Sequence, residues 1–110
     1  MTLDEYQKNI TEVLKPVQHP RIASLLALTE EVGEVSKEAM NLEIYEVEKN
    51  TSRLSDELAD VFLSLCELAS LYNISLEDAV QKKLDKIRKK VPEWEMKMGN
   101  ALSKKRKQWD

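Results

Sequence analysis

The chain has few of the residues that interrupt helices or cross-link chains. Its 110 residues include two glycines, three prolines and one cysteine. Because residues that favour strands are not clustered either, this composition predicts a helical domain with almost no β-sheet. Cys66 alone cannot form an intramolecular disulfide. No signal peptide and no apolar run of about 18 residues is present, so a cytoplasmic location without a membrane anchor is expected.

The length suits one domain of ordinary size, to which assembly with further copies would add buried surface. Four amphipathic segments follow helical spacing, which predicts a four-helix-bundle-like, all-α fold. The predicted helices cover about 2–15, 22 to between 43 and 49, 54–72, and 76 to Pro92. Pro92 either ends the last helix or starts a short fifth one. We therefore divide the chain into a helical domain, 1–92, and a basic C-terminal extension, 93–110.

The third predicted helix is apolar over more than half of its circumference. Its apolar residues include Leu54, Leu58, Val61, Phe62, Leu65, Cys66, Leu68, Ala69 and Tyr72. A helix of this kind is buried on more than one side. Because three other helices can hardly cover it, we expect a second subunit and therefore a homo-oligomer.

Acidic residues gather in the middle of the chain. Between Glu30 and Asp60 there are ten acidic and three basic residues. Glu31 with Glu34, and Glu57 with Asp60, are spaced to lie on one side of a helix. If the two helices pack together, four carboxylates converge, which is unfavourable unless cations neutralise them. All-oxygen ligands favour Mg²⁺, with Mn²⁺ as a second choice.

Such acidic pairs are also common on solvated helix faces, and one pair alone means little. On helical projections, Glu31 lies at the margin of the apolar arc of its helix. Glu57 lies beside Leu68, at the margin of the apolar arc of the next helix. Both carboxylates would point along the helix interface, where they need cations or basic partners. Gly33, inside the first cluster, costs about 1 kcal/mol relative to alanine. Its presence suggests close approach by a backbone or a ligand.

The two clusters form a recognisable pattern. Glu30-Glu31-Val32-Gly33-Glu34 and, after 22 intervening residues, Glu57-x-x-Asp60 resemble the E-E-x-x-E and E-x-x-D signature of the MazG-like nucleoside triphosphate pyrophosphohydrolases. The similarity covers roughly residues 21 to 91. It implies a helical bundle that assembles as a homodimer or homotetramer. It also implies Mg²⁺-dependent cleavage of a nucleoside triphosphate to a monophosphate and pyrophosphate, a reaction used in cleansing nucleotide pools.

Carried over by position, the resemblance makes Glu31, Glu34, Glu57 and Asp60 the metal ligands. Glu30 also matches the motif and is a candidate for substrate binding. Some relatives have an asparagine in the last helix where this chain has Ile87, so contacts made by that asparagine are in doubt.

The chemistry needs no nucleophilic side chain, because a water molecule made acidic by the metal can attack phosphorus. Glu34, or Glu38 one turn further on, is the candidate proton acceptor. Lys83 and Lys86 in the fourth helix are candidates to meet the phosphates, although a solvated basic face explains them equally well.

His19 precedes a proline in a connector, and Cys66 lies in the densest apolar run, so both are left out of the site. Two other functions remain open. A non-catalytic helical oligomerisation or interaction module would bind no metal tightly. A nucleic-acid binder would use the basic residues of the fourth helix and 104–107, but the net charge of −3 and the absence of a groove-reading motif make it unlikely.

Overall fold

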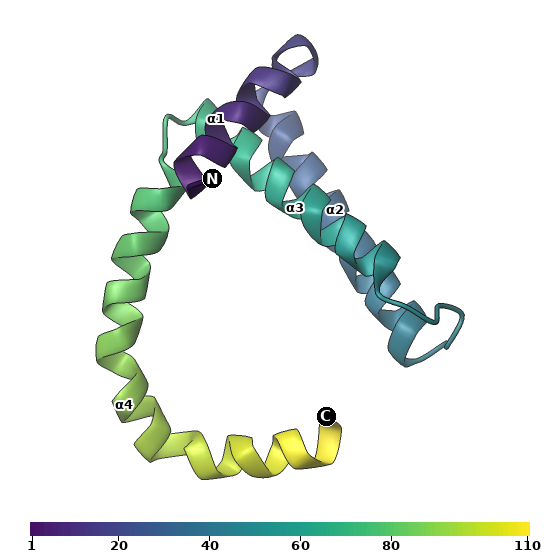
Figure 1. Ribbon diagram of the computed structural model, residues 1–110, viewed down its shortest axis with the longest axis vertical. Coiled ribbons are helices and arrows are strands. Elements are labelled where there is room, and N and C mark those ends of the chain that lie inside the picture. Colours follow the sequence, from purple (N-terminus) through teal and green to yellow (C-terminus); the bar gives the residue numbers. More distant parts are fainter. The chain divides into compact units, whose positions relative to one another are not determined.

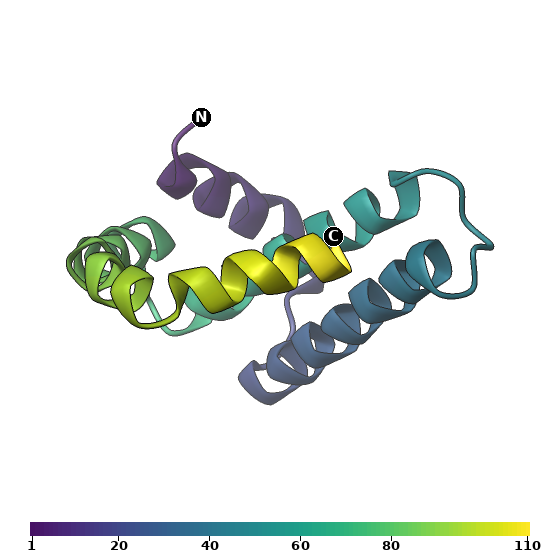
Figure 2. The same ribbon diagram turned by 90° about the horizontal axis from the view of Figure 1, so that it is seen from below.

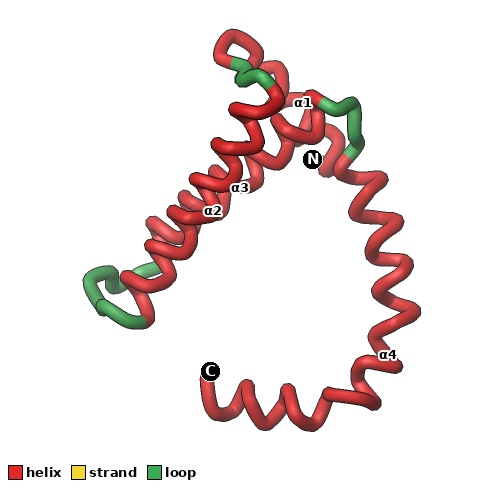
Figure 3. The backbone as a smooth tube through the Cα atoms, turned by 180° about the vertical axis from the view of Figure 1, so that it is seen from behind, coloured by secondary structure: helices red, strands yellow, loops and turns green.

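The computed structural model describes all 110 residues as α-helices joined by short connections, with no strand (Figure 3). The elements are α1 (Leu3–Leu14), the 3-10 turn η1 (Lys15–Val17), α2 (Arg21–Glu43), α3 (Ser52–Leu71) and α4 (Leu76–Trp109). The predicted all-α class with four principal helices is confirmed. The chain divides into two compact units, Met1–Glu77 and Asp78–Asp110, which are described separately below.

In the first unit, α3 is the central helix. It lies along α2 for most of its length, and α1 packs on it as well (Figures 1 and 2). This arrangement agrees with the expectation that α3 is covered on more than one side. The buried apolar residues are few, however: Cys66 is fully buried and Ala69 is 8% exposed.

The ends of α1 and α2 follow local rules. Thr2 and Glu5 form a capping box, in which each side chain accepts a hydrogen bond from the other residue's backbone N–H. The sequence predicted a plain connector between the first two helices. In the structure, Pro16 instead lies in the first turn of η1, where its fixed φ is tolerated. The helix α2 ends at Glu43, within the predicted interval.

The connection from α2 to α3 is fastened to both helices. The N–H groups of Val47 and Glu48 both donate to the carbonyl of Asn41, at 3.0 and 3.2 Å. The Arg53 guanidinium forms an ion pair with Glu48 at 3.0 Å. These contacts fix the start of α3 relative to the end of α2.

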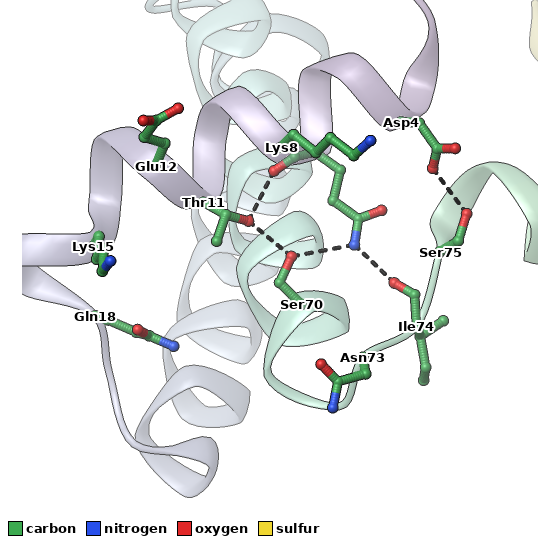
Figure 4. A pocket seen from close by; sticks show the side chains of 11 residues that line it. Asp4, Lys8, Thr11, Glu12, Lys15, Gln18, Ser70, Asn73, Ile74 and Ser75 are labelled. Atoms are coloured by element: carbon green, nitrogen blue, oxygen red, sulfur yellow. Dashed lines mark hydrogen bonds between the residues drawn. The ribbon is translucent and has the colours of Figure 1, made fainter.

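A polar clasp, made by Gln7, Thr11 and Ser70 with Ile74 and Leu76, joins α1 to the end of α3. The Gln7 side chain is buried; its amide nitrogen donates to the Ile74 carbonyl at 2.7 Å and to Ser70 Oγ at 3.2 Å. Its oxygen accepts from the N–H of Leu76 at 2.9 Å. Thr11 and Ser70 share a further hydrogen bond (Figure 4). Gln7 therefore satisfies two backbone groups just after Asn73, whose φ of 56° ends the helical path of α3.

In the second unit, α4 does not end at Pro92. It continues as one helix to Trp109, so the expected break or new helix at this proline is wrong. Pro92 cannot donate to the carbonyl of Arg88, and its ring crowds that carbonyl, a conflict that a bent helix relieves. Figure 1 shows the α4 ribbon changing direction part-way along. Whether 93–110 acts as a separate extension stays a prediction.

No single helix is long and apolar enough to span a membrane; only α3 and α4, taken together as a bent pair, meet the requirements of length and composition.

Candidate metal centre

Three of the four predicted metal ligands meet at the interface of α2 and α3. One carboxylate oxygen each from Glu31, Glu57 and Asp60 lies within 4.8 Å of the other two. The i,i+3 spacing of Glu57 and Asp60 puts both on the side of α3 that faces α2. All three side chains are partly buried. The sequence prediction that the two acidic segments converge is therefore realised by these three residues.

The fourth predicted ligand, Glu34, lies beside this three-carboxylate cluster without joining its close triad. Its charge is among those that raise the pKa values of Glu31 and Glu57. Glu30 is exposed on α2, and it also raises the pKa of Glu31. Both residues thus contribute to the same negative field.

The cluster is electrostatically unfavourable without a cation. Burial raises the pKa of Glu31, and the charges of Asp60, Glu30 and Glu34 raise it further, while a hydrogen bond with Glu57 acts in the opposite direction. Burial likewise raises the pKa of Glu57, followed by the charges of Asp60, Glu31, Glu34 and Asp56. Both carboxyls therefore hold their protons more strongly than an isolated carboxyl does.

No base of the first unit forms an ion pair with the cluster. The ion pairs of the structure join Glu67 to His19, Glu48 to Arg53, Asp85 to Arg88 and Glu93 to Lys97. None of them includes Glu31, Glu34, Glu57 or Asp60. Since the donors are all carboxylate oxygens, the set fits a hard divalent cation such as Mg²⁺ or Mn²⁺.

A cavity of about 610 Å³ adjoins the cluster and shares Glu57 with it. Glu38, which is only 7% exposed, lines this cavity from α2, and residues of the first turns of α3 line the opposite wall. Sequence reasoning singled out Glu38 but missed the contribution of Ser52, Arg53 and Ser55. In the sequence, only their position directly after Asn50 and Thr51, at the start of the helix that carries Glu57, could have pointed to them.

The remaining residues singled out in the sequence are not members of the three-carboxylate cluster. Lys83 and Lys86 are exposed residues of α4 in the second unit. His19 Nδ1 forms a hydrogen bond with Oε1 of the buried Glu67 at 2.9 Å. Cys66 is buried, and burial raises the pKa of its thiol, in agreement with a place in the core.

Gly33 has no close neighbour in the chain. A Cβ at this position would meet no atom within 4 Å. The close approach suggested by the sequence is therefore not made by any part of this chain.

The structure is an all-helical domain with a carboxylate cluster that could hold a divalent cation, and comparison with protein families agrees with the acidic motifs of its sequence. The family model described as the MazG nucleotide pyrophosphohydrolase domain matches residues 20–94. The chain therefore belongs to the MazG nucleotide pyrophosphohydrolase family, as its acidic motifs indicated. No curated protein and no solved structure was found to match it.

Proposed function

We propose that the chain is a Mg²⁺-dependent nucleoside triphosphate pyrophosphohydrolase that converts an NTP or dNTP to the monophosphate and pyrophosphate. One observation carries the proposal: Glu31, Glu57 and Asp60 converge without a basic partner, in a chain of the MazG family. A role in cleansing the nucleotide pool of the cytoplasm follows from this activity.

Glu31, Glu57 and Asp60, with Glu34 as the fourth donor, would hold the cation. When bound, Mg²⁺ supplies charge neutralisation to the triphosphate and makes a water molecule more acidic. Manganese would suit the same oxygen donors. The partly buried position of the carboxylates limits their hydration and strengthens their interaction with a cation.

Proton transfer requires a carboxylate beside the reacting water. Glu34 takes this role in the proposal, because its charge acts on both Glu31 and Glu57. A new bond forms between the water oxygen and the α-phosphorus, the bond to the bridging oxygen breaks, and pyrophosphate leaves with the electron pair. Glu34 accepts the proton of the water. Glu30, Lys83 and Lys86 are the proposed contacts to the substrate.

The proposal includes a homodimer or homotetramer. Three substantially exposed apolar residues recur at intervals of seven along α3 and its C-cap: Leu58 at 53%, Leu65 at 39% and the C-cap residue Tyr72 at 53%. Residues seven apart lie on nearly the same side of a helix. This α3 stripe, together with the small core, supports burial by a second copy.

The decisive experiment is a panel of ribo- and deoxynucleoside triphosphates assayed for pyrophosphate release with Mg²⁺, with Mn²⁺ and with chelator. We expect release that requires a divalent cation, together with thermal stabilisation by millimolar Mg²⁺. If no nucleotide is cleaved and Mg²⁺ gives no stabilisation, the proposal fails. A non-catalytic interaction module would then be the better explanation.

A further inference from the structure

One oxygen of Glu38 has no partner within the fold. The residue is 7% exposed, and its Oε2 atom is buried without a hydrogen bond. A carboxylate oxygen that is removed from water and left without a donor is costly, and buried polar groups in native proteins are nearly always satisfied. The position of Glu38 therefore calls for a hydrogen-bond donor from outside the chain.

Glu38 lines the cavity beside the metal cluster, and this cavity is large enough for part of a small molecule. Its volume of about 610 Å³ falls within the usual range for ligand pockets. The other wall is formed by the start of α3. The polar residues there are Ser52, Arg53, Ser55, Asp56 and Glu57.

The cavity is placed to receive the end of a ligand whose phosphates lie at the cluster. Glu57 belongs both to the cluster and to the cavity wall. On α2, Glu38 follows Glu31 by two helical turns on the same side, roughly 10 Å along the helix axis. A nucleotide with its phosphates at the cluster would therefore extend its nucleoside along α2 toward Glu38.

The charges of the cavity select the kind of group that enters it. Glu38, Asp56 and Glu57 are acidic, while the only basic residue, Arg53, already pairs with Glu48 at 3.0 Å. A phosphate would be repelled here. A carboxylate accepts hydrogen bonds and offers none, so a neutral group that donates hydrogen bonds suits the cavity best.

We propose that this cavity is a nucleoside subsite, in which the Glu38 carboxylate accepts a hydrogen bond from the nucleoside and sets the choice of substrate. The inference rests on the proposed function, because that function puts the phosphates at the cluster. The donor is a base amino group or a sugar hydroxyl, which offer the same chemistry.

The test compares wild type with Glu38→Gln on CTP, UTP, dCTP and dUTP in the presence of Mg²⁺. The amide keeps the shape of the carboxylate but also donates. If a base amino group is the donor, the ratio of kcat/KM for CTP over UTP should fall roughly ten- to hundredfold, mainly through KM. If a sugar hydroxyl is the donor, the ratio of CTP over dCTP should fall instead. Glu43→Gln, the same change at an exposed position of α2, should leave all ratios unchanged.

Binding of CMP, UMP, dCMP and dUMP, measured by calorimetry, gives a readout that is independent of turnover and should show the same change of preference. Glu38→Asp, which keeps the charge but withdraws it by one methylene, serves if the glutamine variant does not fold. Two results would overturn the subsite: an equal loss of kcat for every nucleotide with unchanged binding, or a changed melting temperature with unchanged ratios. If wild type cleaves no nucleotide of the full ribo- and deoxynucleoside triphosphate panel and gains no stability from Mg²⁺, the proposed function fails, and monophosphate binding alone then decides the subsite.

Discussion

Glu57 occupies two environments at once. Its carboxylate belongs to the cluster with Glu31 and Asp60, and its side chain also lines the cavity reached by Glu38. Burial and four neighbouring carboxylates raise its pKa. The charged Glu57 carboxylate therefore destabilises the metal-free protein. In the proposed function, the same carboxylate is required to bind the metal.

Glu57→Gln should separate activity from stability. Removing one negative charge relieves repulsion, so we expect the metal-free variant to melt at the same temperature as wild type or slightly higher. With millimolar Mg²⁺ the wild type should gain stability, about 2.7 kcal/mol at a hundred times Kd, and the variant should gain little. Pyrophosphate release should be severely reduced. A variant that kept near-full hydrolysis would contradict the metal site.

The same carboxylates predict a dependence of stability on pH. Because the pKa values of Glu31 and Glu57 are raised above 4.5 in the folded chain, the folded state holds protons that the unfolded state releases. These groups favour folding below the unfolded pKa and oppose it as pH rises through the folded pKa.

We therefore expect metal-free wild type to lose stability relative to the double variant Glu31→Gln, Glu57→Gln as the pH rises from about 4 to about 7. Urea denaturation at a series of pH values would measure the difference. Millimolar Mg²⁺ should offset the loss in the wild type alone. A difference that did not vary with pH would argue against mutual repulsion in the cluster.

At the scale of elements, the polar clasp at Gln7 is the contact that fastens α1. Gln7→Met keeps the length of the side chain but leaves the Ile74 carbonyl and the Leu76 N–H without their partner. We expect the free energy of unfolding to fall by about 1–3 kcal/mol for each buried group left unsatisfied. Gln18→Met, the same change at an exposed position, should be close to neutral. Equal losses in the two variants, measured by urea denaturation, would rule out a special role for Gln7.

Helices that are determined by the periodicity of their apolar residues were predicted well from the sequence. Features that depend on a single residue or contact were not. The apolar spacing around Leu54 and Tyr72 located α3 because burial of one face is a property of the whole segment. Pro92 was expected to end a helix, but a bend accommodates it. Gln7 carried no signal, because a glutamine on an amphipathic helix is ordinary unless its distant partners are known.

The candidate site shows the same division. Helical spacing and the MazG resemblance predicted that Glu31, Glu57 and Asp60 come together, and they do. Spacing did not reveal that Oε2 of Glu38 is buried without a donor, because this depends on how α2 and α3 enclose the cavity.

At the scale of the whole molecule, exposed apolar surface predicts self-association. Leu65→Lys puts a charge in the middle of the α3 stripe, where Leu65 is 39% exposed. We expect wild type to sediment as a dimer or tetramer at micromolar concentration and the variant to shift toward the monomer. Val13→Lys, at a residue of α1 that is 76% exposed and outside the stripe, is the matched control. A wild type that sediments as a stable monomer would contradict the proposed assembly.

The polar clasp also bears on the order in which the domain folds. Glu31 and Glu57 are brought together by two consecutive helices, whereas Gln7 and Ser70 are 63 residues apart in sequence. Closing the longer loop costs about 0.8 kcal/mol more in chain entropy than closing the loop between the two glutamates. The α2–α3 hairpin should therefore be formed in the folding transition state and α1 should dock after it. In stopped-flow experiments, Gln7→Met should speed unfolding and leave the folding rate unchanged. Glu31 and Glu57 would then lie close together before α1 docks.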